Sequence, residues 1–577
     1  MTYATRGALS RLLLSTFMAT LCLASFTTRG AVGAEKKPQR PDDCWFYVSC
    51  NPDNEERTDF LISLIERGSS VGYNGMLWAT AWEGCGSWSA AKLANVERVK
   101  ASAKKANVEL IPILWSIGYG TMIAKDPNLA EGLLVEDLPL KVEGNVAAFQ
   151  PDDAEIPNGG METWKNNKLT EIGFHDKPNE ISFRDEETKR SGNSSVRFEN
   201  LASDQHGHGR LMTTVKVKPN RVYRVSVWMK LEGFVGNDLL QVYRTSGEQM
   251  ASTGAATPVK PDADGTRTSD WSLYTATFRA PEEGEVRIYL GAWNGKTGKL
   301  WADDLTIEPL GLVNPLRRDG TPFVVRNADR TVVYEEGKDW ILPEFNLRGW
   351  DRNAPSQKLT IPAGSRVKDG DVLSVDFYAP AVTASNQLGT CMSEPKLYKL
   401  FEEDAQDVAR VLGPKKWFLS MDEIRCGGSC ESCKKRGLSL AQILADCVAK
   451  QRAIIKNVDP DAEIYIWSDM FDPNHNAHDD YYVCEGDYTG VWDMIPKDLI
   501  ISCWYYEKRD DSLKFFSERG FKTQGAAYYD KDDLKTSLDW FDSCDKTPGC
   551  VGVMYTTWRN KYELLEDFGK AAAERKK

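Results

Sequence analysis

The sequence lacks an excess of positive charge and has few long apolar runs. Its formal net charge is -12 at pH 7, which argues against nucleic-acid binding because phosphate recognition needs a basic face. After Phe26 there is no run of about 18 uncharged apolar residues, so no later segment is predicted to span a bilayer. Neutral ligands such as sugars stay compatible with this charge.

Cysteine is too sparse for a fold built on disulfides. The chain has 13 cysteines among 577 residues, far below the density of small disulfide scaffolds. Cys426, Cys430 and Cys433 are nevertheless crowded together. Their spacing suits either a disulfide that staples a loop, with the third thiol free or paired elsewhere, or zinc ligation, which needs a fourth ligand. The two alternatives stay open at this point, and no metal site is predicted.

The beginning of the chain has the order of a secretory signal peptide. Arg6 and Arg11 precede the apolar stretch 12–26, and small residues follow at 31–34. We predict cleavage close to Glu35. The mature protein is therefore expected to be secreted or periplasmic.

Strand-like segments alternate with helix-like segments on both sides of a long insertion. The strand-like runs are residues 44–50, 75–80, 108–115, 416–423, 463–470, 498–505, 522–529 and 550–558. Eight such units predict an α/β fold, a (β/α)8 TIM barrel interrupted after its third strand by an all-β sandwich of the jelly-roll type.

The insertion has a different texture, with short alternating strands separated by Gly, Asn, Asp and Pro turns, which is typical of a β-sandwich. The predicted parts are a signal peptide (1–34), the first part of the barrel with strands one to three (35–150), the inserted sandwich (151–312), a β-rich accessory or return segment (313–395) and the second part of the barrel with strands four to eight (396–577).

Two adjacent carboxylates, Asp422 and Glu423, end the apolar run 417–421. Barrel enzymes place their chemistry at the carboxyl ends of the strands. Alternation puts Asp422 on the same strand face as Phe418 and Ser420, the predicted barrel interior, and a bend could turn Glu423 into the mouth. Desolvation and a neighbouring like charge raise the pKa of a carboxyl, as a glycosidic general acid requires. We predict Glu423 as catalytic acid and base, with Asp422 as its partner.

Aromatic and polar residues gather at the ends of other predicted strands. The predicted substrate-binding residues are Trp78, Trp467, Asp469, Trp504, Tyr505, Tyr528, Tyr529, Asp530, Trp558 and Arg559. Taken singly, a strand-end tryptophan is as often packing as pocket lining, but their repetition favours the wall of a sugar subsite. Asp469 or Asp530 is the alternative second carboxylate for a glycosidase that uses two protein carboxyls.

The insertion resembles carbohydrate-binding modules of families 4 and 9. The resemblance rests on the segments 158–164, 192–198, 223–228, 271–278 and 300–306. Such modules stack aromatic faces against the apolar surfaces of sugar rings. The resemblance implies Trp228, Trp271, Trp293 and Trp301 as sugar-binding candidates, with core packing as the alternative for each.

The barrel resembles the catalytic domain of family 20 hexosaminidases, in which an Asp-Glu pair closes the fourth strand, as Asp422 and Glu423 do here. The resemblance implies that Glu423 is the general acid and base. It further implies that Asp422 orients the acetamido group of the substrate, which acts as the nucleophile.

The sequence therefore predicts a glycoside hydrolase that needs no cofactor and acts on an oligosaccharide or polysaccharide, with N-acetylhexosamine-containing glycans as the implied substrates. One alternative is a glycan-binding protein without catalysis. The other is a two-carboxylate glycosidase that does not require a 2-acetamido group.

Overall fold

The computed structural model of the chain describes residues 43–151, 154–254, 258–262, 265–343 and 354–575. The predicted signal peptide, residues 1–34, lies outside the described residues. Within these ranges no helix combines the length and the apolar character needed to cross a membrane.

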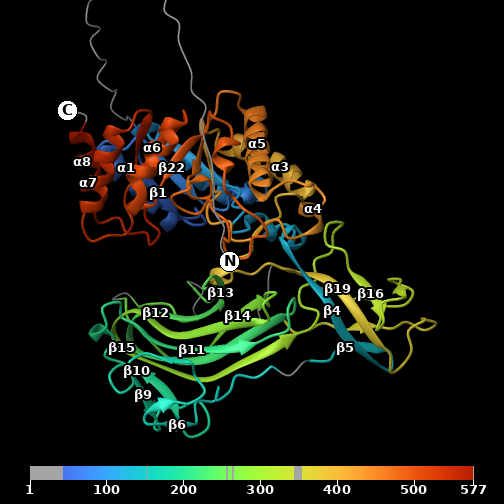
Figure 1. Ribbon diagram of the computed structural model, residues 1–577. Coiled ribbons are helices and arrows are strands. Elements are labelled where there is room, and N and C mark those ends of the chain that lie inside the picture. Colours follow the sequence, from blue (N-terminus) through green and yellow to red (C-terminus); the bar gives the residue numbers. More distant parts are fainter. Residues whose placement is uncertain (1–42, 152–153, 255–257, 263–264, 344–353, 576–577) are drawn as a thin grey trace, which may run out of the picture. The chain divides into compact units, whose positions relative to one another are not determined.

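Eight parallel strands close into a barrel, and the first strands of the chain lie among elements from its last third (Figure 1). In order around the barrel they are β1 (Asp43–Ser49), β2 (Gly75–Ala79), β3 (Glu109–Leu114), β20 (Lys416–Leu419), β21 (Glu463–Trp467), β22 (Ile500–Cys503), β23 (Lys522–Ala526) and β24 (Cys550–Tyr555). Each of them falls within, or within one residue of, a segment predicted as a barrel strand. Because β24 pairs with β1, the sheet has no free edge.

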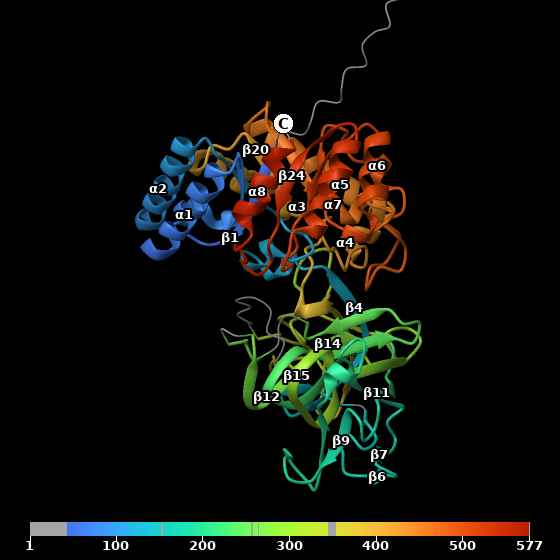
Figure 2. The ribbon, with the colours of Figure 1, turned by 90° about the vertical axis from the view of Figure 1, so that its left-hand side faces the viewer.

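Helices surround these strands (Figure 2). They are α1 (Glu55–Ser70), α2 (Ala90–Ala106), α3 (Pro395–Val411), the short α4 (Glu431–Lys434), α5 (Leu440–Val458), α6 (Arg509–Glu518), α7 (Lys535–Lys546) and α8 (Leu565–Glu574). Local sequence sets their starts. Ser439, for example, begins α5 with a capping box, in which its side chain accepts from the Gln442 N–H and the Gln442 side chain accepts from the Ser439 N–H.

The predicted alternation of β20 is confirmed. Phe418 packs in the barrel interior with residues such as Trp45 and Tyr465 from other strands. Trp417 and Leu419 face the opposite way and pack in the cluster beneath the helices. Side chains thus fill the barrel interior. The end of the barrel that can hold a site is the one at which the strands have their carboxyl ends.

The predicted fold class is wrong in two respects. The insertion between β3 and β20 is not one jelly-roll sandwich but contains an eight-stranded and a six-stranded antiparallel sheet. The alternation of strands and helices is also incomplete, because β21 and β22 are joined only through the 3₁₀ turns η6 (Asp469–Phe471) and η7 (Val491–Asp493). The described chain is a closed parallel barrel with antiparallel sheets, and β-structure prevails over most of the insertion.

The eight-stranded sheet is dominated by two very long strands, β12 (Val222–Arg244) and β15 (Glu285–Leu310), which pair with one another. Its other strands are β8 (Phe174–His175), β9 (Ser182–Asp185), β10 (Ser195–Phe198), β11 (Gly209–Lys216), β13 (Gln249–Ser252) and β14 (Arg267–Arg279). Gly233, Gly236 and Gly298 lie where the register of the long strands shifts. Glycine is common both at β-bulges and in turns. The sequence therefore predicts several short strands where the structure has two long strands with bulges.

The six-stranded sheet combines segments from both sides of the eight-stranded one in the sequence. Its order is β17 (Val333–Tyr334), β16 (Val324–Asn327), β19 (Val372–Pro380), β4 (Gly132–Glu143), β5 (Val146–Phe149) and β18 (Leu359–Thr360). A separate pair is formed by β6 (Trp164–Lys165) and β7 (Lys168–Leu169).

Candidate active site

A cavity of about 460 Å³ lies at the carboxyl ends of the barrel strands. Every strand contributes to it, either directly or through the residues that follow it. The lining consists of Tyr47, Ala79, Thr80, Glu83, Ile113, Leu114, Ser116, Tyr119, Thr121, Ser420, Asp422, Glu423, Trp467, Trp504, Tyr529 and Trp558. Its volume lies within the range of pockets that enclose small ligands.

Asp422 is a half-buried carboxyl of the cavity, which the buried Glu83 also lines. The Ser420 hydroxyl donates to its Oδ1 over 2.9 Å. Burial raises the pKa of Asp422 to about 7, and the charges of Asp469 and Glu423 add to the effect. Near neutral pH this carboxyl therefore changes its charge in response to small changes around it.

Glu423 follows in a left-handed backbone conformation, with φ at 49°. Non-glycine residues rarely adopt this region, and it is held here by a hydrogen bond of 2.8 Å from the Glu423 N–H to Oδ2 of Asp469. Gly118 makes room for the turn, since a Cβ at that position would lie 2.3 Å from the Asp422 carbonyl oxygen. Because of this backbone conformation, the side chains of Asp422 and Glu423 both line one cavity.

The Glu423 carboxylate lies at the rim of the cavity, with its side chain 23% exposed. Oε1 forms an ion pair of 2.7 Å with Arg425, and Oε2 accepts from the Tyr119 hydroxyl. Arg425 also donates to Gln387 and stacks 5.0 Å above the ring of Tyr482. Both oxygens of Glu423 are therefore oriented by donors that are themselves held in place.

Asp469 lies behind the cavity and is completely buried. Besides the Glu423 N–H, it accepts from Asn476 Nδ2 over 2.8 Å and from Trp504 Nε1 over 3.2 Å. Burial is the main reason why the pKa of Asp469 rises to about 6. Its contacts make it a positioning residue, because it fixes both the turn at Glu423 and an aromatic wall.

Aromatic rings form much of the remaining wall. The ring of Trp558 lies 5.9 Å from that of Trp467, 5.1 Å from that of Tyr47 and 6.2 Å from that of Tyr529. Trp467 is buried, whereas Tyr529 and Trp558 keep much of their surface exposed. The rings offer apolar faces beside the two carboxyls, an arrangement suited to a sugar ring.

The predicted site residues divide into two groups. Asp422, Glu423, Trp467, Trp504, Tyr529 and Trp558 line the cavity. Among the others, Tyr505 lines a neighbouring cavity with His475, and Arg559 is exposed outside the lining. Asp530 accepts from Thr557 and from the Trp558 N–H, and so braces the wall from behind.

Two further predicted residues are buried away from the cavity. Trp78 donates Nε1 to the Cys50 carbonyl over 2.8 Å and packs against Trp82. Tyr528 stacks on Tyr555 with ring centroids 4.1 Å apart and donates to the Lys531 carbonyl.

Sequence reasoning missed the contributions of β1 and β3. Tyr47 lies on β1, and Ser116 and Tyr119 follow β3. The signal available for Tyr119 was its place just after a predicted barrel strand, where the strand-end rule that selected Asp422 also applies.

The four tryptophans of the insertion have different surroundings. Trp301 is buried and donates to Asp185 over 2.9 Å. Trp228 is covered by Arg190 at 4.5 Å, and Trp271 is half-buried. Trp293 lines a cavity of about 230 Å³ together with Arg210, Gln241, Tyr243, Gly247, Arg287 and Tyr289.

No family model and no curated protein matches the chain. Solved structures that resemble it include glycoside hydrolases and carbohydrate-binding modules. A rhamnosidase from Novosphingobium sp. PP1Y is similar over 90% of this chain and 55% of its own, at 10% identity and a TM-score of 0.32. A β-N-acetylhexosaminidase is similar over 33% and 45%, at 13% identity and a TM-score of 0.26.

The carbohydrate-binding module TmCBM61, solved in complex with β-1,4-galactotriose, is similar over 27% of this chain and 98% of its own, at 17% identity and a TM-score of 0.21.

Proposed function

We propose that the protein is a glycoside hydrolase whose reaction takes place at Asp422 and Glu423. The observation that carries the proposal is the placement of two adjacent carboxyls in one aromatic-walled cavity, one desolvated and one at the rim. Cleavage of a glycosidic bond needs a group that exchanges a proton with the leaving oxygen and a second group that stabilises positive charge at the sugar.

The positions of the two carboxyls favour a division of roles. Glu423 lies at the rim, where the leaving group of a sugar bound in the cavity would lie, so we assign it proton transfer. The desolvated Asp422 is assigned to the sugar itself. For a 2-acetamido sugar, its carboxylate would accept a hydrogen bond from the acetamido N–H and offset the positive charge that develops there.

The proposed reaction has two steps. The acetamido carbonyl oxygen attacks the anomeric carbon while Glu423 protonates the glycosidic oxygen, which leaves as an alcohol. Water then attacks the cyclic oxazolinium intermediate and gives its proton to Glu423. Arg425 pairs with Oε1 of Glu423 and so orients the side chain for this second step.

Hydrolysis of aryl glycosides with and without a 2-acetamido group tests the proposed function. We expect turnover of the acetamido sugars alone, because only they carry their own nucleophile. Equal turnover of plain glycosides would instead support the two-carboxylate alternative. If no glycoside is hydrolysed but sugars still bind in calorimetry, the protein is a glycan-binding protein and the proposal fails.

We further propose that the cavity at Trp293 binds glycan chains, and that the protein is exported to reach them. Arg210 lies 5.8 Å from the Trp293 ring, and Tyr243 and Tyr289 meet edge to face at 5.5 Å. Charged donors beside aromatic faces suit hydroxylated, partly apolar sugar rings.

Replacement of this ring, Trp293→Ala, should weaken binding to a soluble polysaccharide about tenfold, the effect of losing one well-packed aromatic contact. Turnover of small aryl glycosides should stay unchanged. Affinity electrophoresis measures the binding, and Trp271→Ala serves as the control because Trp271 lies outside the cavity lining. Equal losses in both variants would contradict a site at Trp293.

A further inference from the structure

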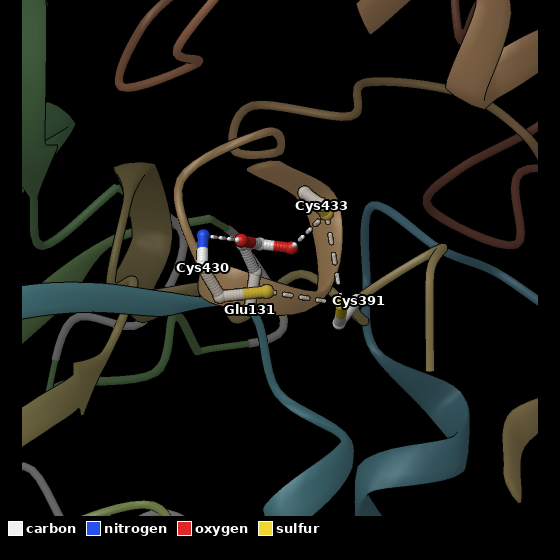
Figure 3. Close-up of side chains that lie close together, drawn as sticks. All are labelled: Glu131, Cys391, Cys430 and Cys433. Atoms are coloured by element: carbon white, nitrogen blue, oxygen red, sulfur yellow. Dashed lines mark hydrogen bonds between the residues drawn. The ribbon is translucent and has the colours of Figure 1, made fainter. Parts of the chain in front are cut away.

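Three cysteines and one glutamate from three separate segments of the chain converge in a closed cluster (Figure 3). Glu131 immediately precedes β4, Cys391 precedes α3, and Cys430 and Cys433 lie at α4. Their exposed fractions are 1%, 0%, 0% and 2% in that order. The potential ligand atoms of the four residues all lie within 4.8 Å of one another.

Three distances within the cluster are close to those of a tetrahedral zinc site. The Cys391 Sγ lies 3.4 Å from the Cys430 Sγ and 3.8 Å from the Cys433 Sγ, and the Cys433 Sγ lies 3.7 Å from Oε2 of Glu131. Tetrahedral zinc with ordinary bond lengths separates two sulfurs by about 3.8 Å, and a sulfur and an oxygen by about 3.5 Å. With all four ligand atoms within 4.8 Å of one another, the side chains come close to the spacing that one ion requires.

The Glu131 carboxylate is oriented for ligation by its second oxygen. Oε1 accepts from the Ser429 N–H over 3.2 Å, the Ser429 hydroxyl over 2.8 Å and the Cys430 N–H over 2.9 Å. These bonds leave Oε2 directed at the cysteines, as Figure 3 shows. Hydrogen bonds to one part of a ligating side chain commonly fix the other part toward a metal.

A buried carboxylate among three thiols calls for a cation. Burying an ionised carboxylate is costly unless an opposite charge compensates it. Arg318, which comes close to this segment, directs its guanidinium to Glu394 over 3.1 Å and to the Ala130 carbonyl over 3.0 Å. A divalent ion within the cluster would supply the compensating charge directly.

We propose that Glu131, Cys391, Cys430 and Cys433 bind one zinc ion. The protein fills all four positions, so the ion is structural and leaves no place for substrate. It joins the segment after β3, the segment before α3 and the loop that follows Glu423. Thiolate-rich coordination selects zinc over magnesium or calcium.

Metal analysis of the purified full-length chain tests the proposal. We expect one zinc per chain in the wild type and loss of most of it in Cys430→Ser and Cys433→Ser. Cys426→Ser is the matched control, because Cys426 is buried in the same loop but lies outside the cluster. It should keep its zinc. Wild type without zinc, or equal loss from Cys426→Ser, would overturn the proposal.

Two measurements on the wild type keep the proposal testable if the variants fail to fold. Exchange of zinc for cobalt should produce the thiolate charge-transfer and d–d bands of a tetrahedral site. Peptide mapping without reduction should find no disulfide among Cys391, Cys430 and Cys433. A disulfide between any two of them in the purified protein, or a cobalt spectrum without thiolate bands, would replace the zinc site by the loop-stapling alternative.

Discussion

Glu423→Gln should lose about 10³-fold in kcat/KM on glycosides with a poor leaving group, within the usual range for removal of a general acid. The loss should be much smaller for an activated leaving group such as 2,4-dinitrophenol, which departs without protonation. Steady-state kinetics on a series of aryl glycosides of graded acidity measures the difference. Glutamine keeps the size of the side chain but has one oxygen, so it cannot accept from both Tyr119 and Arg425, and the dependence on the leaving group is what identifies the transferable proton.

Azide provides the second part of this experiment. For activated substrates the variant should be limited by attack of water, which has lost its base, and azide needs no base. We expect azide to restore turnover and to yield a glycosyl azide of the same anomeric configuration as the substrate. A loss of equal size for every leaving group, without azide rescue, would remove Glu423 from proton transfer.

Asp469→Asn should shift the pH dependence of kcat/KM to lower pH. The pKa of Asp422 is raised to about 7 first by burial and next by the charge of Asp469. Removing that negative charge makes ionisation of Asp422 easier, so its pKa falls, by about one unit for a close like charge. If Asp422 acts as a carboxylate, kcat/KM rises with pH through the pKa of Asp422, and this rise shifts to lower pH in the variant.

Whether kcat/KM rises or falls with increasing pH also decides the role of Asp422. A rate that falls as pH increases through about 7, with the fall moved to lower pH in Asp469→Asn, would make Asp422 the proton donor in place of Glu423. Asp530→Asn is the control. Asp530 braces Trp558 and is not among the main causes of the raised pKa of Asp422, so its variant should keep the wild-type dependence of the rate on pH. An unchanged pH dependence in Asp469→Asn would refute the electrostatic coupling.

Most barrel strands could be predicted because they combine an apolar run with a polar end, a pattern that β23, with Thr523 and Gln524, lacks. The same regularity located Asp422 and Glu423, as well as the walls formed by Trp467, Trp504 and Trp558. Trp78 shows where the reasoning was too coarse. Its neighbour Leu77 packs inside the barrel, and strict alternation along β2 sends Trp78 to the outside.

Other features depend on contacts between distant segments and leave little local signal. The six-stranded sheet joins β4 to β19, which are separated by the whole eight-stranded sheet. Cys391 and Glu131 reach Cys430 and Cys433 only through the folded chain. Neither has a spacing relative to Cys430 that a sequence motif would include, so the fourth ligand could not be found locally.

The barrel has a seam at the place where the insertion interrupts it. β3 and β20 are in register only at Ile113 opposite Phe418 and Leu114 opposite Leu419, whereas β1 and β2 pair from Trp45 to Ser49. During synthesis β3 must wait for some 300 residues before its second partner, β20, exists, and closing so long a loop slows folding. Because only two residue pairs hold it, this ladder is expected to be among the first to fray. Because Glu423 follows β20 and Tyr119 follows β3, local opening of the barrel here would separate Glu423 from Tyr119 before the rest of the molecule unfolds.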